Sequence, residues 1–267
     1  MRLNRRQTLA AALAAGAAAS LPAMLRAQAA APGTAAPAAA PEFLTPFGHA
    51  SLMLTLGGQK ILVDPVGGAD RYASAGTPAA VLVTHEHGDH FDPETLAAVV
   101  TEGVALIVNP AVAEKLPEAL RSRATVMANG DTGEVAGMAI EAVPAYNVTP
   151  ERTQYHPKGR DNGYVLTSPD HGRIYVAGDT EATPEFRAQK DIAVAFVPMN
   201  LPYTMEVDQA VEGVAEMAPK MVIPYHHRGN DPAEFAEKLR ATGAATAIAI
   251  ATVDWYPESD DPTGPSS

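Results

Sequence analysis

The chain has 267 residues, of which 46% are hydrophobic and 19% are charged, so it is long and apolar enough to bury a sizeable core. It contains no cysteine, which excludes disulfides, thiolate zinc sites, iron–sulfur clusters and a cysteine nucleophile. A net charge of −12 and an aromatic content of 6% argue against a surface for nucleic acid or anionic lipid.

The first residues have the composition of an export signal. They contain the adjacent pair Arg5 and Arg6, then an Ala/Leu-rich stretch, and then the small-residue motif Ala27-Gln28-Ala29. This order is typical of a cleaved secretory signal of the twin-arginine type, with a retained anchor as the alternative. It predicts a periplasmic protein with no stable membrane span after cleavage. The predicted boundaries are a signal peptide over 1–29, an Ala/Pro-rich linker over 30–41, a folded domain over 42–256 and a disordered tail over 257–267.

Within the domain, short apolar runs alternate with helical patterns. Strands outnumber helices, and the first two are expected to pair as a hairpin across Gly57 and Gly58, which favours antiparallel or mixed sheets flanked by helices. Ten strands are predicted over 51–56, 60–63, 80–84, 105–108, 139–143, 163–167, 173–177, 193–197, 221–224 and 247–251, and five helices over 93–100, 111–120, 184–188, 207–217 and 232–241.

Three of the eight histidines fall in one window, Thr84–His90, between a predicted strand and a predicted helix. Side chains at i and i+2 of an extended segment point the same way, so His85 and His87 can hold one metal ion. After a turn, Asp89 and His90 face a second position. Imidazole and carboxylate without thiolate suit Zn²⁺, and also Mn²⁺ or Fe²⁺. The pattern predicts a site for one or two ions, with zinc as the first choice.

The H-x-H-x-D-H motif of this window resembles the signature of the metallo-β-lactamase superfamily. Supporting stretches include Phe47–Leu54 and Val222–His227, and the resemblance runs from about Glu42 to Asp254. It is nearest to the lactonase-like metal-dependent hydrolases, which are similar to N-acyl-phosphatidylethanolamine phospholipase D. The resemblance implies an α/β fold, a four-layer αββα sandwich with the metal ions at one edge of its sheets. It also implies hydrolysis of an ester, lactone or phosphodiester by a metal-bound hydroxide.

The resemblance gives further residues a role. Asp179 would bridge the two ions, and His226 would be the last ligand, while His227 would support that ligand or face the substrate. Asp64 would hold the metal loop through hydrogen bonds without touching metal. Asp89, besides binding metal, would orient the attacking water and receive its proton.

One position departs from the family pattern. The third ligand of the first ion is normally a histidine at a strand end, but this chain has Asn147, a weak ligand for zinc or manganese. His156, nine residues further on, either replaces that ligand or contacts the substrate. Because Asn147 is a weak ligand, the first site is expected to be the weaker one. His49 is implied near the metal centre, as a ligand or a supporting group, against the alternative of a structural histidine.

Other polar residues have weaker predicted roles. Lys158 and Arg160 are either substrate-binding charges or ordinary solvated residues. His171 lies in a polar turn and is expected at the surface. The resemblance makes Asn200, Tyr203 and Met205 candidates for the pocket wall.

Three functions remain compatible with these residues. The first is the metal-dependent hydrolase, acting on a small molecule. The second is a redox protein of the same fold, although His87 stands where that pattern has a glutamate. The third is a non-catalytic metal-binding protein, which Asn147 keeps possible. The sequence decides neither the substrate nor the oligomeric state.

Overall fold

The structure is a computed structural model that describes residues 38–244 and 247–256. The predicted signal peptide, the disordered tail and residues 30–37 of the predicted linker lie outside these residues. Ala38, within the predicted linker, forms a parallel bridge with Ala251 and donates its backbone N–H to the carbonyl oxygen of Ile250 over 2.8 Å.

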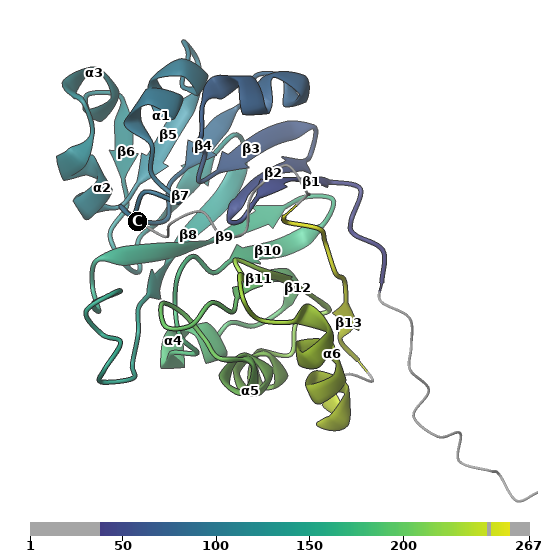
Figure 1. Ribbon diagram of the computed structural model, residues 1–267. Coiled ribbons are helices and arrows are strands. Elements are labelled where there is room, and N and C mark those ends of the chain that lie inside the picture. Colours follow the sequence, from purple (N-terminus) through teal and green to yellow (C-terminus); the bar gives the residue numbers. More distant parts are fainter. Residues whose placement is uncertain (1–37, 245–246, 257–267) are drawn as a thin grey trace, which may run out of the picture. The chain divides into compact units, whose positions relative to one another are not determined.

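Two sheets form the centre of the domain (Figure 1). The strand order is β1-β2-β3-β4-β5-β6 in the first, where β1 to β3 are antiparallel and β3 to β6 parallel. Its strands are β1 (Leu44–Gly48), β2 (Ser51–Leu56), β3 (Gln59–Val63), β4 (Ala80–Leu82), β5 (Ala105–Val108) and β6 (Ala124–Val126).

The second sheet has the order β13-β12-β11-β10-β9-β8-β7 and is also mixed, with β7 to β10 antiparallel and β10 to β13 parallel. Its strands are β7 (Thr132–Val135), β8 (Met138–Ala145), β9 (Asp161–Ser168), β10 (Gly172–Val176), β11 (Ile192–Pro198), β12 (Met221–Tyr225) and β13 (Ala249–Ile250).

Three apolar clusters define four layers. One cluster joins the two sheets, with side chains such as Leu54 and Phe196 from facing strands. A second packs the first sheet against a 3₁₀ helix and three short helices, and a third packs the second sheet against three more helices. The first group is η1 (Ala69–Ala75), α1 (Pro93–Val99), α2 (Pro110–Lys115) and α3 (Glu118–Arg121), and the second is α4 (Pro184–Arg187), α5 (Val207–Met217) and α6 (Pro232–Ala241).

This arrangement confirms the predicted α/β fold with αββα layers, and Figure 1 shows one helical layer on the outer face of each sheet. The four layers follow from the geometry of the strands, because successive residues of a strand point to opposite faces of its sheet. On β12, for example, Ile223 packs between the sheets whereas Val222 packs against the helices.

Several predicted elements need correction. The helix predicted over 111–120 is two helices, because Pro117 cannot continue a helix and disfavours the helical conformation at Leu116, whose ψ is 139°. The strands β1, β6 and β7 were not predicted. All three lie at sheet edges, where most of their residues are exposed or half-buried, so they carry few of the alternating apolar residues that identify a strand. The predicted hairpin is confirmed, with Leu56 opposite Gln59.

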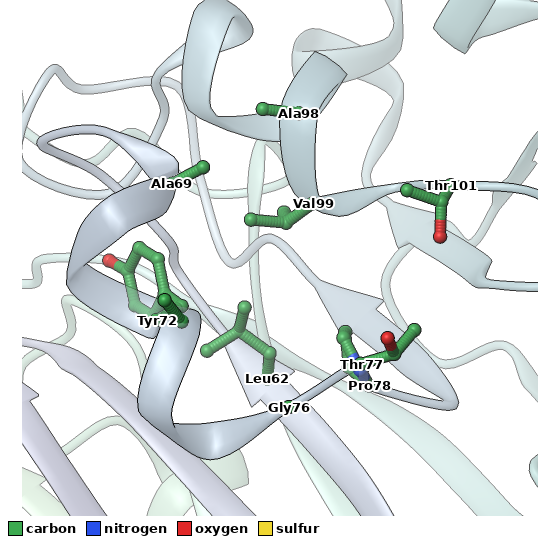
Figure 2. A pocket seen from close by; sticks show the side chains of 10 residues that line it. Leu62, Ala69, Tyr72, Gly76, Thr77, Pro78, Ala98, Val99 and Thr101 are labelled. Carbon is green, nitrogen blue, oxygen red and sulfur yellow. The ribbon is translucent and has the colours of Figure 1, made fainter.

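A cleft lies on the outer side of the first sheet, between η1 and α1 (Figure 2). Its wall is mostly apolar and includes Leu62, Tyr72 and Val99, but none of the predicted site residues. The hydroxyl of Tyr72 is already bonded to Ser51 and Val66. Within residues 38–244 and 247–256, no helix combines the length and the hydropathy that a membrane crossing requires.

One close approach in the second sheet requires glycine. A Cβ at Gly163 would lie 2.9 Å from the carbonyl oxygen of Val176 and closer still to that of Ala177. Gly163 follows Asp161 and Asn162 at the start of β9, so a shift of this strand would also move the residues beside the predicted metal loop.

We expect Gly163→Ala to lower the free energy of unfolding by about 2 kcal/mol, because the added methyl group must push two backbone segments apart. Gly133→Ala on β7 is the matched control. Its Cβ would meet only the Ile140 side chain, at 3.9 Å, so it should change stability by less than about 0.5 kcal/mol. Chemical denaturation of both variants measures the difference, and equal stabilities would contradict the packing argument.

Candidate metal centre

Strand ends bring the predicted ligands together. Asp64 follows directly on β3, and His226 follows directly on β12. The loop after β4 carries the histidine motif, and the loop after β10 carries Asp179. Residues from both sheets therefore meet at one edge of the sandwich, as the sequence predicted.

Three of the polar residues turn the chain sharply as they leave a strand. His49, Asp64 and His226 follow β1, β3 and β12 and have left-handed φ values of 46°, 48° and 45°. A non-glycine residue is uncommon in this conformation, which costs about 1–2 kcal/mol. Such strain persists where the surrounding contacts fix the residue, and it is concentrated at functional sites.

Asp64 holds the histidine loop through hydrogen bonds. Its carboxylate accepts the backbone N–H and the hydroxyl of Thr84, each at 2.7 Å, and lies 2.8 Å from Nδ1 of His90. Because Nδ1 of His90 is engaged by Asp64, its Nε2 is the nitrogen that faces Asp179, 3.3 Å from Oδ1. The geometry is that of the supporting role predicted for Asp64.

His156 completes a cluster of three imidazoles. One ring nitrogen each of His85, His87 and His156 lies within 4.8 Å of the others. Nδ1 of His156 lies 3.0 Å from Oδ2 of Asp161, while its Nε2 faces Asp179 at 3.5 Å. Of the two roles that the sequence left open for His156, this geometry favours the replacement ligand.

Asn147 has a different task. Its amide nitrogen donates to the carbonyl oxygens of Arg152 and Tyr203, at 3.1 and 2.7 Å. Asn147 thereby anchors the start of the loop that carries His156 to the loop after β11. The expectation of a weak first site assumed that no third imidazole was present, and the position of His156 removes that assumption.

Asp179 is the centre of the site. Its carboxylate oxygens lie 3.8 Å from Nε2 of His85 and 3.3 Å from Nε2 of His226, in addition to the contacts with His90 and His156. His85, His90 and Asp179 form a second group of metal-ligand spacing, and His49, Asp89 and His226 form a third. Asp179 thus has the position that a bridging ligand needs.

The donor set fits divalent cations. The Nε2 atoms of His85, His90 and His156 are buried, and they make no hydrogen bond within the described part of the chain. A buried polar atom left in this state costs about 1–3 kcal/mol, and a bound cation removes that cost. Burial also lowers the pKa of His85 and of His87, which favours the neutral form that binds metal.

The carboxylates of the site also favour a bound cation. Burial alone would raise the pKa of Asp179, but the nearby His226 and His90 outweigh it and lower that pKa. Burial alone would lower the pKa of His90, but the carboxylates of Asp179 and Asp89 raise it to about 10. Ionised carboxylates therefore attract positive charge into the site, which a divalent cation can supply.

Of the remaining predicted residues, some lie at the site and others lie elsewhere. His49 is part of the site, with Nε2 3.1 Å from Oδ2 of Asp89. His227 packs edge-on against Tyr256, with ring centroids 5.2 Å apart. His171 is at the surface beside Asp170, as expected. Met205 is wrong as a pocket-wall residue, because it is fully buried in the core under α5.

Two residues of the site were not predicted. Asp161 binds His156, and Tyr256 lies 2.8 Å from Nδ1 of His49 through its hydroxyl. Asp161 begins a strand and Tyr256 ends the predicted domain, and neither position stands out in a single sequence. Only the partner histidine identifies their role, and that partner is known from the fold.

Comparisons with known proteins identify the family of this fold. A model of the beta-lactamase superfamily domain matches residues 43–226. A UPF0173 metal-dependent hydrolase from Methanopyrus kandleri is 28% identical over 221 residues, covering 78% of this chain and 95% of the relative. Another from Nitratidesulfovibrio vulgaris is 30% identical over 196 residues, covering 68% and 79%. A crystal structure from Parabacteroides distasonis, named for a metal-dependent hydrolase, is 42% identical, with coverages of 78% and 91% and a TM-score of 0.70.

The chain therefore belongs to the β-lactamase superfamily, as the resemblance of its histidine motif indicated. The nearer resemblance to the lactonase-like branch stays a prediction.

We expect His156→Ala to remove one tightly bound metal equivalent, because it deletes the third imidazole of the first set. His171→Ala removes a half-buried histidine outside the site and should leave the stoichiometry unchanged. Asn147→Ala should also keep that equivalent, since His85, His87 and His156 supply three imidazoles without the Asn147 amide. Calorimetric titration of metal-stripped protein tests all three. Loss of an equivalent in Asn147→Ala but not in His156→Ala would reverse the two assignments.

Proposed function

We propose that this metal-dependent hydrolase cleaves a small neutral ester or lactone, and that Asp89 orients the attacking water and takes up its proton. The observation that carries the proposal is the cluster of imidazoles around the buried Asp179, with the carboxylate of Asp89 beside it. The ligands around Asp179 are buried, whereas the Asp89 side chain is 42% exposed. Asp89 is thus a carboxylate that both a bound ion and a substrate can reach.

The metal fits the site and would be held by His85, His87 and His156 on one side, and by Asp89, His90 and His226 on the other, with Asp179 between them. Divalent cations there supply the Lewis acidity that hydrolysis at neutral pH needs, and zinc suits the nitrogen-rich donor set. A redox role is less well supported, because His87 belongs to a cluster of imidazoles, where the redox pattern has a glutamate.

Asp89 has the contacts that a proton acceptor needs. His49 and His226 both face its Oδ2, at 3.1 and 3.3 Å, so the carboxylate can turn Oδ1 toward a water molecule. Burial alone would raise the pKa of Asp89, but the charge of His90 and the hydrogen bonds of the neighbouring imidazoles lower it. Asp89 is therefore ionised at neutral pH and able to accept a hydrogen bond from the water.

The neighbouring cations favour a neutral substrate over a phosphodiester. Arg160 donates to both oxygens of Asp161, at 2.7 and 2.9 Å. Lys158 pairs with Glu185 at 3.1 Å, and Arg152 pairs with the buried Glu181 at 3.1 Å. An anionic substrate would have to compete with these carboxylates for positive charge. A carbonyl group needs no such counter-charge, because its negative charge develops only during the reaction.

Hydrolysis by the metal-reconstituted protein of a short-chain aryl ester, a γ-lactone and an aryl phosphodiester tests this proposal. We expect kcat/KM to be highest for the ester or the lactone. Asp89→Asn should lower kcat by about 10²-fold or more, because the amide cannot take up a proton. His171→Ala is the matched control and should retain full activity. The proposal fails if the phosphodiester is the best substrate, or if Asp89→Asn keeps both its metal and its turnover.

A further inference from the structure

His49, near the start of the domain, is held by residues from its C-terminal part. Its backbone N–H donates to the carbonyl oxygen of Trp255 over 3.1 Å, and its own carbonyl oxygen accepts the backbone N–H of His226, also at 3.1 Å. Its ring packs on that of His226, with centroids 3.8 Å apart. These contacts determine where the two ring nitrogens of His49 lie.

Each ring nitrogen has one partner. Nδ1 lies 2.8 Å from the hydroxyl of Tyr256, and Nε2 lies 3.1 Å from Oδ2 of Asp89. A neutral imidazole carries hydrogen on only one nitrogen, so these partners decide whether Nε2 is a donor or a metal ligand.

The surroundings of Tyr256 determine the first partner. The backbone N–H of His227 donates to its hydroxyl oxygen over 3.1 Å. That oxygen therefore already accepts one hydrogen bond, and the hydroxyl has a hydrogen of its own to donate. Nδ1 of His49, 2.8 Å away, is the acceptor that faces this hydrogen.

The second partner gives the same result independently. An ionised carboxylate can only accept hydrogen bonds. Nε2 of His49, at 3.1 Å from Oδ2 of Asp89, must therefore carry the hydrogen. The contact with Asp89 requires this tautomer, and the contact with Tyr256 is satisfied by it.

We propose that Tyr256 fixes His49 as the Nε2–H tautomer, so that His49 is a hydrogen-bond donor that positions Asp89 and not a metal ligand. Within the group formed by His49, Asp89 and His226, only the last two then bind metal. The tautomer rests on these contacts alone, whereas its effect on turnover rests on the function proposed for Asp89. Tyr256 is a positioning residue that acts through His49.

Nitrogen NMR of the full chain, labelled with ¹⁵N-histidine and loaded with Zn²⁺, tests the tautomer directly. The His49 resonances are those absent from His49→Ala. We expect Nε2 to be protonated and Nδ1 to be unprotonated in the wild type. In Tyr256→Phe the hydroxyl donor is lost and only Asp89 still favours hydrogen on Nε2, so the Nε2–H tautomer should stay the major form but fall in population. An unprotonated Nε2 in the wild type, with the shift of a zinc-bound nitrogen, would overturn the proposal without any variant.

Metal stoichiometry gives the second readout. At saturating Zn²⁺, His49→Ala should bind as many ions as the wild type, whereas His90→Ala, which deletes a predicted ligand, should bind fewer. Tyr256→Phe should keep its metal and lose on the order of tenfold in kcat with little change in KM, as expected when a supporting hydrogen bond is removed. Loss of an ion in a folded His49→Ala would make His49 a ligand and overturn the proposal. If Asp89→Asn keeps its turnover while His49 shows the expected tautomer, the result would count against the proposed function only.

Discussion

The buried carboxylate of Asp179 faces four imidazole nitrogens at 3.3–3.8 Å, on side chains that are almost fully removed from water. So many polar atoms cannot be desolvated together unless something pairs their charge and fills their lone pairs. Hydrogen bonds within the described protein leave several of these nitrogens without a partner. The need to satisfy this cluster explains why a cation belongs here, and the surrounding fold keeps the cluster together.

The contacts made by the Nδ1 atoms of the site histidines follow one pattern. Asp64 engages Nδ1 of His90, Asp161 engages Nδ1 of His156, and in both cases Nε2 is left to face Asp179. A carboxylate behind a ligating histidine fixes its tautomer and raises its basicity. At His49 the group behind Nδ1 is a hydroxyl that donates, so the pattern is inverted and Nε2 becomes a donor. The same residue type thus serves two roles, according to what lies behind the ring.

The sandwich supplies the geometry. Both sheets are mixed, and the parallel strands β3, β4, β10 and β12 end at the edge where the polar loops gather. Left-handed residues at three strand ends turn the chain there at some cost in backbone energy. Gly163 allows the close approach of β9 to the segment before Asp179, so the packing of the second sheet and the placement of the ligands are linked.

Much of this could be predicted because it is local. The spacing of His85, His87, Asp89 and His90, and the alternation in the central strands, are visible within a few residues. The edge strands were not predicted, because exposed strands lack that alternation. His156 and Asn147 could not be ranked from the sequence, because a loop of nine residues can carry either side chain to the site. Only the anchoring of Asn147 by Tyr203 and the pairing of His156 with Asp161 distinguish them.

The most direct measurement is the anomalous scattering of crystals grown with Zn²⁺, recorded at the zinc edge. We expect an ion with nitrogen ligands from His85, His87 and His156 at about 2.0–2.1 Å, the usual zinc–imidazole distance. Asn147 should remain hydrogen-bonded to backbone carbonyls and make no contact with the ion. An ion in contact with Asn147, with His156 turned away, would contradict the metal centre described above.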